Sequence, residues 1–248
     1  MSEDPIKDGT NWYSYCAGNP VMFVDPLGLK SSTKASISSK KEILKQYNDG
    51  VIEETVNKLL KEQNCTNPDQ DKIYSYINEI KLYMSYNQQI GKMEEDEIEG
   101  ITYSVVLLDL RPISRNSCWI FSQMTRYAWL NNIDLSQEEA EKMALKIPAN
   151  VRNRPSGIVY GSDISIFEPK QILNSLKKNG PIYAELNSRN GLHSVVISGM
   201  VRNLDGEMII SYSNMDGSQV ITSYKKLSKK LVRCGCPSDR QWPWEVNY

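Results

Sequence analysis

The sequence predicts an α+β fold, with helices in the first part of the chain and an antiparallel sheet in the last part. Two observations lead to this prediction. Apolar residues recur at helical spacing over residues 41–95, whereas residues 181–226 contain β-branched runs separated by turns. Helices and strands segregated in this way indicate an antiparallel sheet rather than alternating βαβ units. A chain of 248 residues with 40% hydrophobic side chains can bury one sizeable core and a smaller appendage.

The composition argues against several classes of protein. A formal net charge of −1, from 29 basic and 30 acidic residues, creates no strong field that favours nucleic acid or an anionic membrane surface. No apolar run is long enough to span a membrane, and the opening residues MSEDPIKDGTNWY lack the features of a secretory signal. The 5 cysteines are scattered and odd in number, so we expect a reducing compartment rather than a disulfide framework.

Residues 1–29 differ in texture from the rest of the chain. They are rich in glycine, proline, asparagine and aromatic residues, so we expect short strands and tight turns that cannot bury a core alone. The stretch DPIKDGTNWYSYCAGNPVMFVDPLGL resembles the C-terminal end of the core of Rhs/YD-repeat proteins. The resemblance implies that residues 1–29 are the remnant of a repeat shell, which in some family members cleaves itself at this boundary, near Leu29. It also implies that a variable toxin domain follows.

Residues 30–40, KSSTKASISSK, have no hydrophobic period and predict a linker between modules. Residues 41–98 then form a predicted helical lobe. Apolar positions recur at helical spacing over KEILKQYNDGVIEETVNKLLKEQN and over DKIYSYINEIKLYMSYNQQIG. The triplet 48–50, Asn-Asp-Gly, is a candidate break in the first helix, while Pro68 and Gly91 suit the start and the end of the second. The acidic stretch MEEDEIEG is interpreted as a solvated loop or helix end.

Residues 99–248 form the predicted second domain. It opens with a strand-like run, ITYSVVLLDLRP, and continues with a helix in NSCWIFSQMTRYAWL. A second helix follows Ser136, which fits a capping box with Glu139, and a third has Pro169 in its first turn and Gly180 as its stop. Four extended runs come last: PIYAELN, LHSVVISGMVR, GEMIISYSN and QVITSYKKL.

Cys118 lies where a nucleophilic thiol is expected. It follows the polar, proline-containing stretch RPISRNS and opens an apolar-periodic run, which predicts the N-terminus of a helix. A thiol attacks as thiolate, and a helix N-terminus together with a neighbouring imidazole lowers its pKa. The only histidine, His193, begins the strand HSVVISGM directly after a turn, where a scaffold can present a base to a cleft. The alternatives are a buried structural cysteine and a histidine satisfied in the core.

The stretches NSCWIFSQMTRYAWL and GPIYAELNSRNGLHSVVISGM together resemble the papain-like cysteine peptidase superfamily, over about residues 101–226. The closer likeness is to its compact bacterial effector and leader-processing members. The resemblance implies a papain-like fold, with a central helix packed on an antiparallel sheet. It also implies that Cys118 is the nucleophile, that His193 is the base, and that an Asn or Asp at the end of the next strand orients the imidazole.

The third catalytic residue is open between Asn214 and Asp216. Asn214 ends an apolar run and is preferred, because its carbonyl oxygen can accept a hydrogen bond from an imidazole N–H. Asp216 lies in a Met-Asp-Gly turn, where it is equally well explained as an ordinary turn former.

The oxyanion site departs from the pattern of the superfamily. Papain-like enzymes commonly place a glutamine shortly before the cysteine, but the preceding residues here read DLRPISRNS. The backbone N–H of Cys118 is one expected donor, and Asn116, Ser114 or Arg115 is a candidate for the second. Trp119 is a substrate-cleft candidate that we expect to pack against the histidine strand and shield the ion pair; the alternative is a plain core aromatic.

The remaining cysteines give no metal site. Cys234 and Cys236 are one residue apart, whereas zinc sites usually have wider spacing and further ligands. We expect free thiols or a strained local disulfide there, with Cys16 in the shell remnant and Cys65 in the helical lobe. No cofactor is expected.

Together the two resemblances imply an Rhs-associated toxin domain that acts as a papain-like cysteine protease on a protein of the target cell. Such a domain is delivered by a bacterial secretion system, acts in the target-cell cytoplasm, and has a cognate immunity protein and the Rhs shell as partners. Three alternatives stay open: deamidation or transglutamination with the same triad, a non-catalytic docking module, and a single self-cleavage near Leu29.

Overall fold

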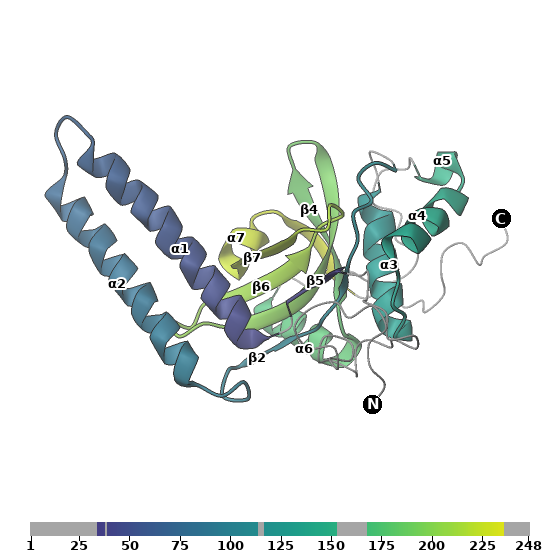
Figure 1. The fold of residues 1–248 in the computed structure, drawn as a ribbon, viewed down its shortest axis with the longest axis horizontal. Helices are drawn as coiled ribbons and strands as arrows, with labels where there is room; N and C mark the ends of the chain where they lie inside the picture. The colour runs from purple at the N-terminus through teal and green to yellow at the C-terminus, as the bar shows by residue number, and fades with distance from the viewer. Residues whose placement is uncertain (1–33, 38, 114–116, 153–167, 236–248) are drawn as a thin grey trace, which may run out of the picture.

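The computed structural model describes residues 34–37, 39–113, 117–152 and 168–235, which form a mixed α and β structure (Figure 1). The shell remnant predicted for residues 1–29 lies outside the described residues. The described part is built on an antiparallel sheet with helices on both faces, which confirms the α+β prediction. Among the described residues, no helix combines the length and the apolarity that a membrane span requires.

The main sheet has six strands among the described residues, in the order β7-β6-β5-β4-β8, with β2 paired to the far end of β5. All pairs are antiparallel. Its strands are β2 (Gly100–Thr102), β4 (Ile182–Ser188), β5 (Gly191–Arg202), β6 (Met208–Ser213), β7 (Gln219–Ser223) and β8 (Leu231–Gly235). The long central strand β5 begins with Gly191 at a φ of 106°, a conformation that favours glycine, and His193 follows two residues later.

One face of the sheet is covered by α3 (Cys118–Asn131), which packs across β5 and β4. Its buried residues Ile120, Phe121 and Met124 share a core with Leu108 and with Val196 of β5. The short helices α4 (Gln137–Lys146) and α5 (Ala149–Arg152) follow, and α4 begins with the predicted capping box of Ser136 and Glu139.

The other face is covered by α6 (Pro169–Asn179) and α7 (Tyr224–Ser228). Pro169 stands in the first turn of α6, and Gly180 ends the helix, as predicted. Gly180 has a φ of 73°, and a Cβ built there would lie 2.1 Å from the ring of Trp129, so this position requires glycine for both conformation and space.

The predicted helical lobe is a hairpin of α1 (Lys40–Gln63) and α2 (Gln70–Lys92), whose far end projects away from the sheet (Figure 1). Its base packs through Ile43 and Leu44 against Val201 and Ile209. The predicted break at residues 48–50 is wrong, because α1 is continuous there.

The physical reason for the continuous helix is the buried side chain of Asn48. Its amide nitrogen donates to Asn87 Oδ1 at 3.0 Å, and its oxygen accepts from Asn203 Nδ2 at 3.1 Å. These partners satisfy the amide in helical geometry, so it does not compete with the backbone as it would in a turn.

Part of the predicted linker belongs to the fold. Strand β1 (Lys34–Ala35) pairs antiparallel with β3 (Val106–Leu107), and Ser39 caps the N-terminus of α1. The run predicted as one strand at residues 101–112 is divided into β2 and β3. Its continuation forms an isolated bridge between Asp109 and Asp216, which ties it to the turn after β6.

Candidate active site

The first turn of α3 holds the sulfur of Cys118, which is buried, with 5% of the residue exposed. Ser117 precedes it without a side-chain cap, and the N–H of Phe121 closes the first turn on the carbonyl of Ser117 at 2.9 Å. The earliest N–H groups of a helix have no partner within the helix, and their dipoles favour negative charge nearby. The local structure therefore favours a thiolate at this position.

His193 lies beside Cys118. It stands near the start of β5, opposite Leu186 of β4, and is half-buried. Its imidazole interacts with the thiol of Cys118, and this interaction lowers the pKa of Cys118 and raises the pKa of His193. The packing of α3 on β5 brings together two residues that are 75 positions apart in the sequence.

Asn214, the first residue after β6, faces the other side of the imidazole. Its Oδ1 lies 3.0 Å from His193 Nε2. A tight turn fixes Asn214, because its N–H donates to the carbonyl of Ser218 at 2.9 Å and its own carbonyl accepts from the N–H of Gly217 at 3.1 Å. Cys118, His193 and Asn214 thus form a line in which the imidazole interacts with the thiol and with the amide.

Asp216 does not touch the imidazole. Its carboxylate accepts hydrogen bonds from the N–H of Ser218, at 3.0 Å, and from the hydroxyl of the same serine. That hydroxyl in turn lies 3.1 Å from Asn214 Nδ2, which donates to it. We call this series of Asp216, Ser218, Asn214 and His193 the Asp216 chain. The sequence interpretation missed Ser218, although a serine two residues after an aspartate in a turn is a recognisable signal.

The direction of every hydrogen bond in the Asp216 chain follows from its first member, the carboxylate of Asp216. A carboxylate only accepts, so the Ser218 hydroxyl donates to Asp216 and accepts from Asn214 Nδ2. The amide oxygen of Asn214 is then the atom that faces His193, and it requires a proton on Nε2. In a neutral imidazole this leaves Nδ1 without a proton, ready to take the proton of the Cys118 thiol.

The pKa values of the two reacting groups move toward an ion pair. Burial raises the pKa of Cys118, but hydrogen bonds from His193 and from the N–H of Ser194 outweigh it, so the net pKa is lowered. The pKa of His193 is raised, first by its hydrogen bond with Cys118 and against the effect of burial, with help from Asn214 and from the charge of Asp216. Both shifts stabilise thiolate and imidazolium together.

One of the predicted site features cannot be followed in the structure, and another can. Ser114, Arg115 and Asn116, the candidate oxyanion donors, lie outside the described residues. Trp119 is half-buried and packs against the core under α3 that includes Val196 of the histidine strand.

The described residues contain no cluster of three or more histidine, cysteine, aspartate or glutamate side chains that could hold a metal ion. Among the described residues, Cys65, Cys118 and Cys234 are in no disulfide bond, while Cys16 and Cys236 lie outside the described part of the chain. Cys234 is buried in the core on the opposite face of the sheet, away from Cys118.

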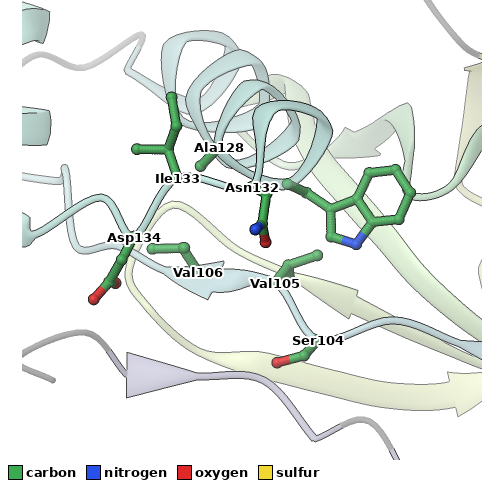
Figure 2. A pocket seen from close by; sticks show the side chains of 8 residues that line it. Ser104, Val105, Val106, Ala128, Asn132, Ile133 and Asp134 are labelled. Carbon is green, nitrogen blue, oxygen red and sulfur yellow. The ribbon is translucent and has the colours of Figure 1, made fainter. Parts of the chain in front are cut away.

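A small pocket lies at the other end of α3. Figure 2 shows that its wall combines residues from the end of α3 and the following turn, such as Ala128, Asn132 and Ile133, with Val105 and Val106 around β3. The nearest helical residue of this pocket, Ala128, lies ten positions after Cys118, which is about 15 Å along α3. The pocket does not contribute to the site around the thiol.

Comparisons with protein-family models, with curated proteins and with solved structures find no match to this chain. The geometry around Cys118 is therefore the basis on which a function is inferred.

Proposed function

We propose that this chain is the toxin tip of an Rhs protein and that it acts as a papain-like cysteine protease on a protein of the target cell. The observation that carries the proposal is the line of Cys118, His193 and Asn214, which lies at the N-terminus of a buried helix. The proton directions in this line leave the imidazole ready to act as a base toward the thiol.

The architecture supports the papain-like part of the proposal. Helix α3 opens on the cysteine and packs across an antiparallel sheet, the base stands on the central strand of that sheet, and the orienting amide follows the next strand. The order of nucleophile, base and orienting residue along the chain is the order that the resemblance to the superfamily implies.

The proposed reaction begins with transfer of the Cys118 proton to Nδ1 of His193. The thiolate attacks the carbonyl carbon of the scissile amide, and the negative charge that develops on the oxygen is met by N–H groups at the start of α3. The imidazolium then gives its proton to the leaving amine. This leaves a thioester on Cys118 and a free amine product.

The second half of the reaction regenerates the thiol. Neutral His193 accepts a proton from a water molecule, whose oxygen attacks the thioester, and the acid product leaves as the sulfur regains its proton. Throughout both halves, Asn214 keeps the imidazole in its orientation and stabilises the imidazolium through Nε2–H.

The Rhs resemblance of residues 1–29 supports the biological setting. On this proposal the domain travels with an Rhs shell, is delivered by a secretion system, and acts in the cytoplasm of the target cell, while a cognate immunity protein blocks its cleft in the producing cell.

The test is expression of the wild type and of Cys118→Ala in a susceptible cytosol, followed by proteome-wide mapping of new protein termini. We expect toxicity and new termini from the wild type and neither from folded Cys118→Ala. Cys65→Ala, which alters an exposed thiol on the hairpin, is the matched control and should behave as the wild type. Intact targets that carry a glutamine-to-glutamate mass change would identify a deamidase, and a toxic Cys118→Ala protein would identify a docking module.

A second reaction, single self-release from the shell, is favoured by the direction of β1. Lys34 pairs with Leu107 and Ala35 with Val106, so the chain enters β1 from the end of β3 that continues to Cys118. On this alternative, the substrate is a peptide bond before Lys34. A longer chain that includes a shell segment should cleave itself near Leu29, and Cys118→Ala should abolish this cleavage.

A further inference from the structure

A second series of polar side chains, on strands β4 and β5, leads to Cys118. Glu185 and Tyr183 lie two residues apart on β4, so they point to the same face, and Ser194 of β5 stands opposite Glu185 in the strand register. All three residues are buried, with at most 1% exposed. We call this series the Glu185 chain.

The contacts of the Glu185 chain are short and continuous. The Tyr183 hydroxyl donates to Glu185 Oε1 at 2.6 Å, and the Ser194 hydroxyl oxygen lies 2.9 Å from that of Tyr183. At its far end, the N–H and the side chain of Ser194 lie close enough to the Cys118 sulfur to lower the pKa of the thiol. The mechanism above makes no use of Glu185, Tyr183 or the serine hydroxyl, although burying such groups is costly and apolar residues would fill the same space.

The number of hydroxyl protons in the Glu185 chain limits the hydrogen bonds that Ser194 can donate. Tyr183 has one hydroxyl proton, which it donates to Glu185. The contact between the two hydroxyls can then be filled only by the proton of Ser194. The same single proton is the only one with which the Ser194 side chain can donate to sulfur. Ser194 therefore has two competing acceptors, Tyr183 and Cys118.

The charge on the sulfur decides between these acceptors. A neutral thiol is a weak acceptor, so the serine proton rests on Tyr183. A thiolate is a strong, charged acceptor, and a hydrogen bond to it is shorter and stronger than one to a phenol oxygen. When the sulfur becomes a thioester it loses its charge, and Tyr183 is again the better acceptor.

We propose that Ser194 is a further catalytic residue of the proposed peptidase, whose hydroxyl turns its proton from Tyr183 to the Cys118 sulfur when the thiolate forms. Tyr183 is the positioning residue, because its oxygen accepts the hydrogen bond of Ser194 in the resting state. Glu185 fixes Tyr183 in this role, because it accepts the hydrogen bond that the single hydroxyl proton of Tyr183 can donate. The thiol proton itself goes to Nδ1 of His193, so rotation of the serine hydroxyl breaks no covalent bond.

Other ionisable groups around the sulfur are few in the described structure. His193 faces it from β5, Tyr183 and Glu185 approach from β4, and Asp216 acts at longer range through His193. The first turn of α3 contributes no acidic residue. The pKa of Cys118 is lowered in part by the Ser194 side chain, which agrees with a donor role.

The test is the pH dependence of Cys118 alkylation by iodoacetamide, followed at this residue by peptide mass spectrometry in the full chain. Ser194→Ala removes the hydroxyl but keeps the backbone N–H, so alkylation at neutral pH should slow about tenfold and its midpoint should move to higher pH. Ser194→Thr keeps a hydroxyl and should stay near the wild type. Tyr183→Phe removes the competing acceptor, so its midpoint should move the opposite way, to lower pH.

Two results would overturn the inference: a wild-type profile in folded Ser194→Ala, or a Tyr183→Phe midpoint that is unchanged or moves to higher pH. If Ser194→Ala does not fold, Tyr183→Phe alone decides. The inference rests on the proposed function only for its catalytic meaning, because alkylation needs no substrate. If the alkylation profiles shift as expected but no new termini appear in target cells, the protease proposal is rejected and the role of Ser194 is kept. If targets are cleaved but the profiles of the variants are unchanged, only the role of Ser194 is rejected.

Discussion

Two series of hydrogen-bonded side chains, the Asp216 chain and the Glu185 chain, lead to the reacting pair of Cys118 and His193. They differ in the group at which they end and in their burial. The Asp216 chain is partly exposed and ends on His193, whereas the Glu185 chain is buried and ends on the sulfur of Cys118. Each begins with a carboxylate that only accepts hydrogen bonds. This sets which atom donates and which accepts in the hydroxyl or amide groups that follow. A carboxylate two or three residues removed from the chemistry can therefore still decide which atom donates and which accepts.

The difference in burial suggests different tasks. The Asp216 chain has one permanent arrangement, because each of its protons has a single acceptor, so it fixes one tautomer of the imidazole. The Glu185 chain has one proton with two acceptors, so it can respond to the charge of the sulfur. Burial strengthens this response, because a hydrogen bond to a charge is stronger where water is excluded.

The largest expected effect comes from removing either reacting group at the junction of the chains. Cys118→Ala or His193→Ala should lower the rate of target cleavage on the order of 10⁴-fold or more, since the nucleophile and its base act as a unit. The rate is measured on a target identified by terminus mapping, with melting temperature as the control for folding. A His193→Ala protein that keeps most of its activity would show that the base is elsewhere.

The next largest effect distinguishes the contributions of the Asp216 chain and the Glu185 chain to the rate of cleavage. Asn214→Ala should reduce cleavage on the order of 10²-fold, because the imidazole loses the group that fixes its tautomer and orientation. Ser194→Ala should cost less, about tenfold, because helix dipole and backbone N–H still stabilise the thiolate. The comparison uses kcat/KM on the same target. The reverse order of the two effects would mean that the Glu185 chain, rather than the Asp216 chain, dominates.

A smaller effect concerns the pH at which the imidazolium is lost. The negative charge of Asp216 helps to raise the pKa of His193, after the larger contribution of Cys118. Asp216→Asn should therefore lower the pKa of His193, and Cys118→Ala should lower it further. Since a lower pKa means that the proton leaves at lower pH, the alkaline limb of activity in Asp216→Asn should move to lower pH.

The histidine pKa can be read directly. His193 is the only histidine in the sequence, so its ring signals in an NMR titration need no assignment within the native chain. An unchanged titration in Asp216→Asn would show that the carboxylate acts only through the geometry of Ser218.

The smallest expected effect is on stability. Tyr183→Phe removes a buried donor to Glu185 and should lower the free energy of unfolding by about 1–2 kcal/mol. Ser218→Ala removes a hydroxyl that is only partly buried and should lower it by about 0.5 kcal/mol. Urea unfolding measures both. Equal losses would contradict the distinction between a buried chain and a partly exposed one.

Much of the fold was predictable because local patterns report local structure. The cap of α4 at Ser136, the limits of α6 at Pro169 and Gly180, and the antiparallel strands β4 to β7 appear in the structure as the sequence indicates, although the helix α7 replaces the end of the last predicted extended run. The continuous α1 and the strand β1 were not predicted. Asn48 and Lys34 have partners more than 30 positions away, and no local pattern reports such contacts.

The sequence by itself determined which residues have the chemistry: one histidine at a strand start, a cysteine at a helix start, and an amide at a strand end. Only the tertiary structure decided how they are connected, that Asn214 rather than Asp216 faces His193, and that Glu185, Tyr183 and Ser194 reach the same sulfur. The physical reason is that residue type sets what a side chain can donate or accept, whereas strand register and helix packing set which partner lies within hydrogen-bonding distance.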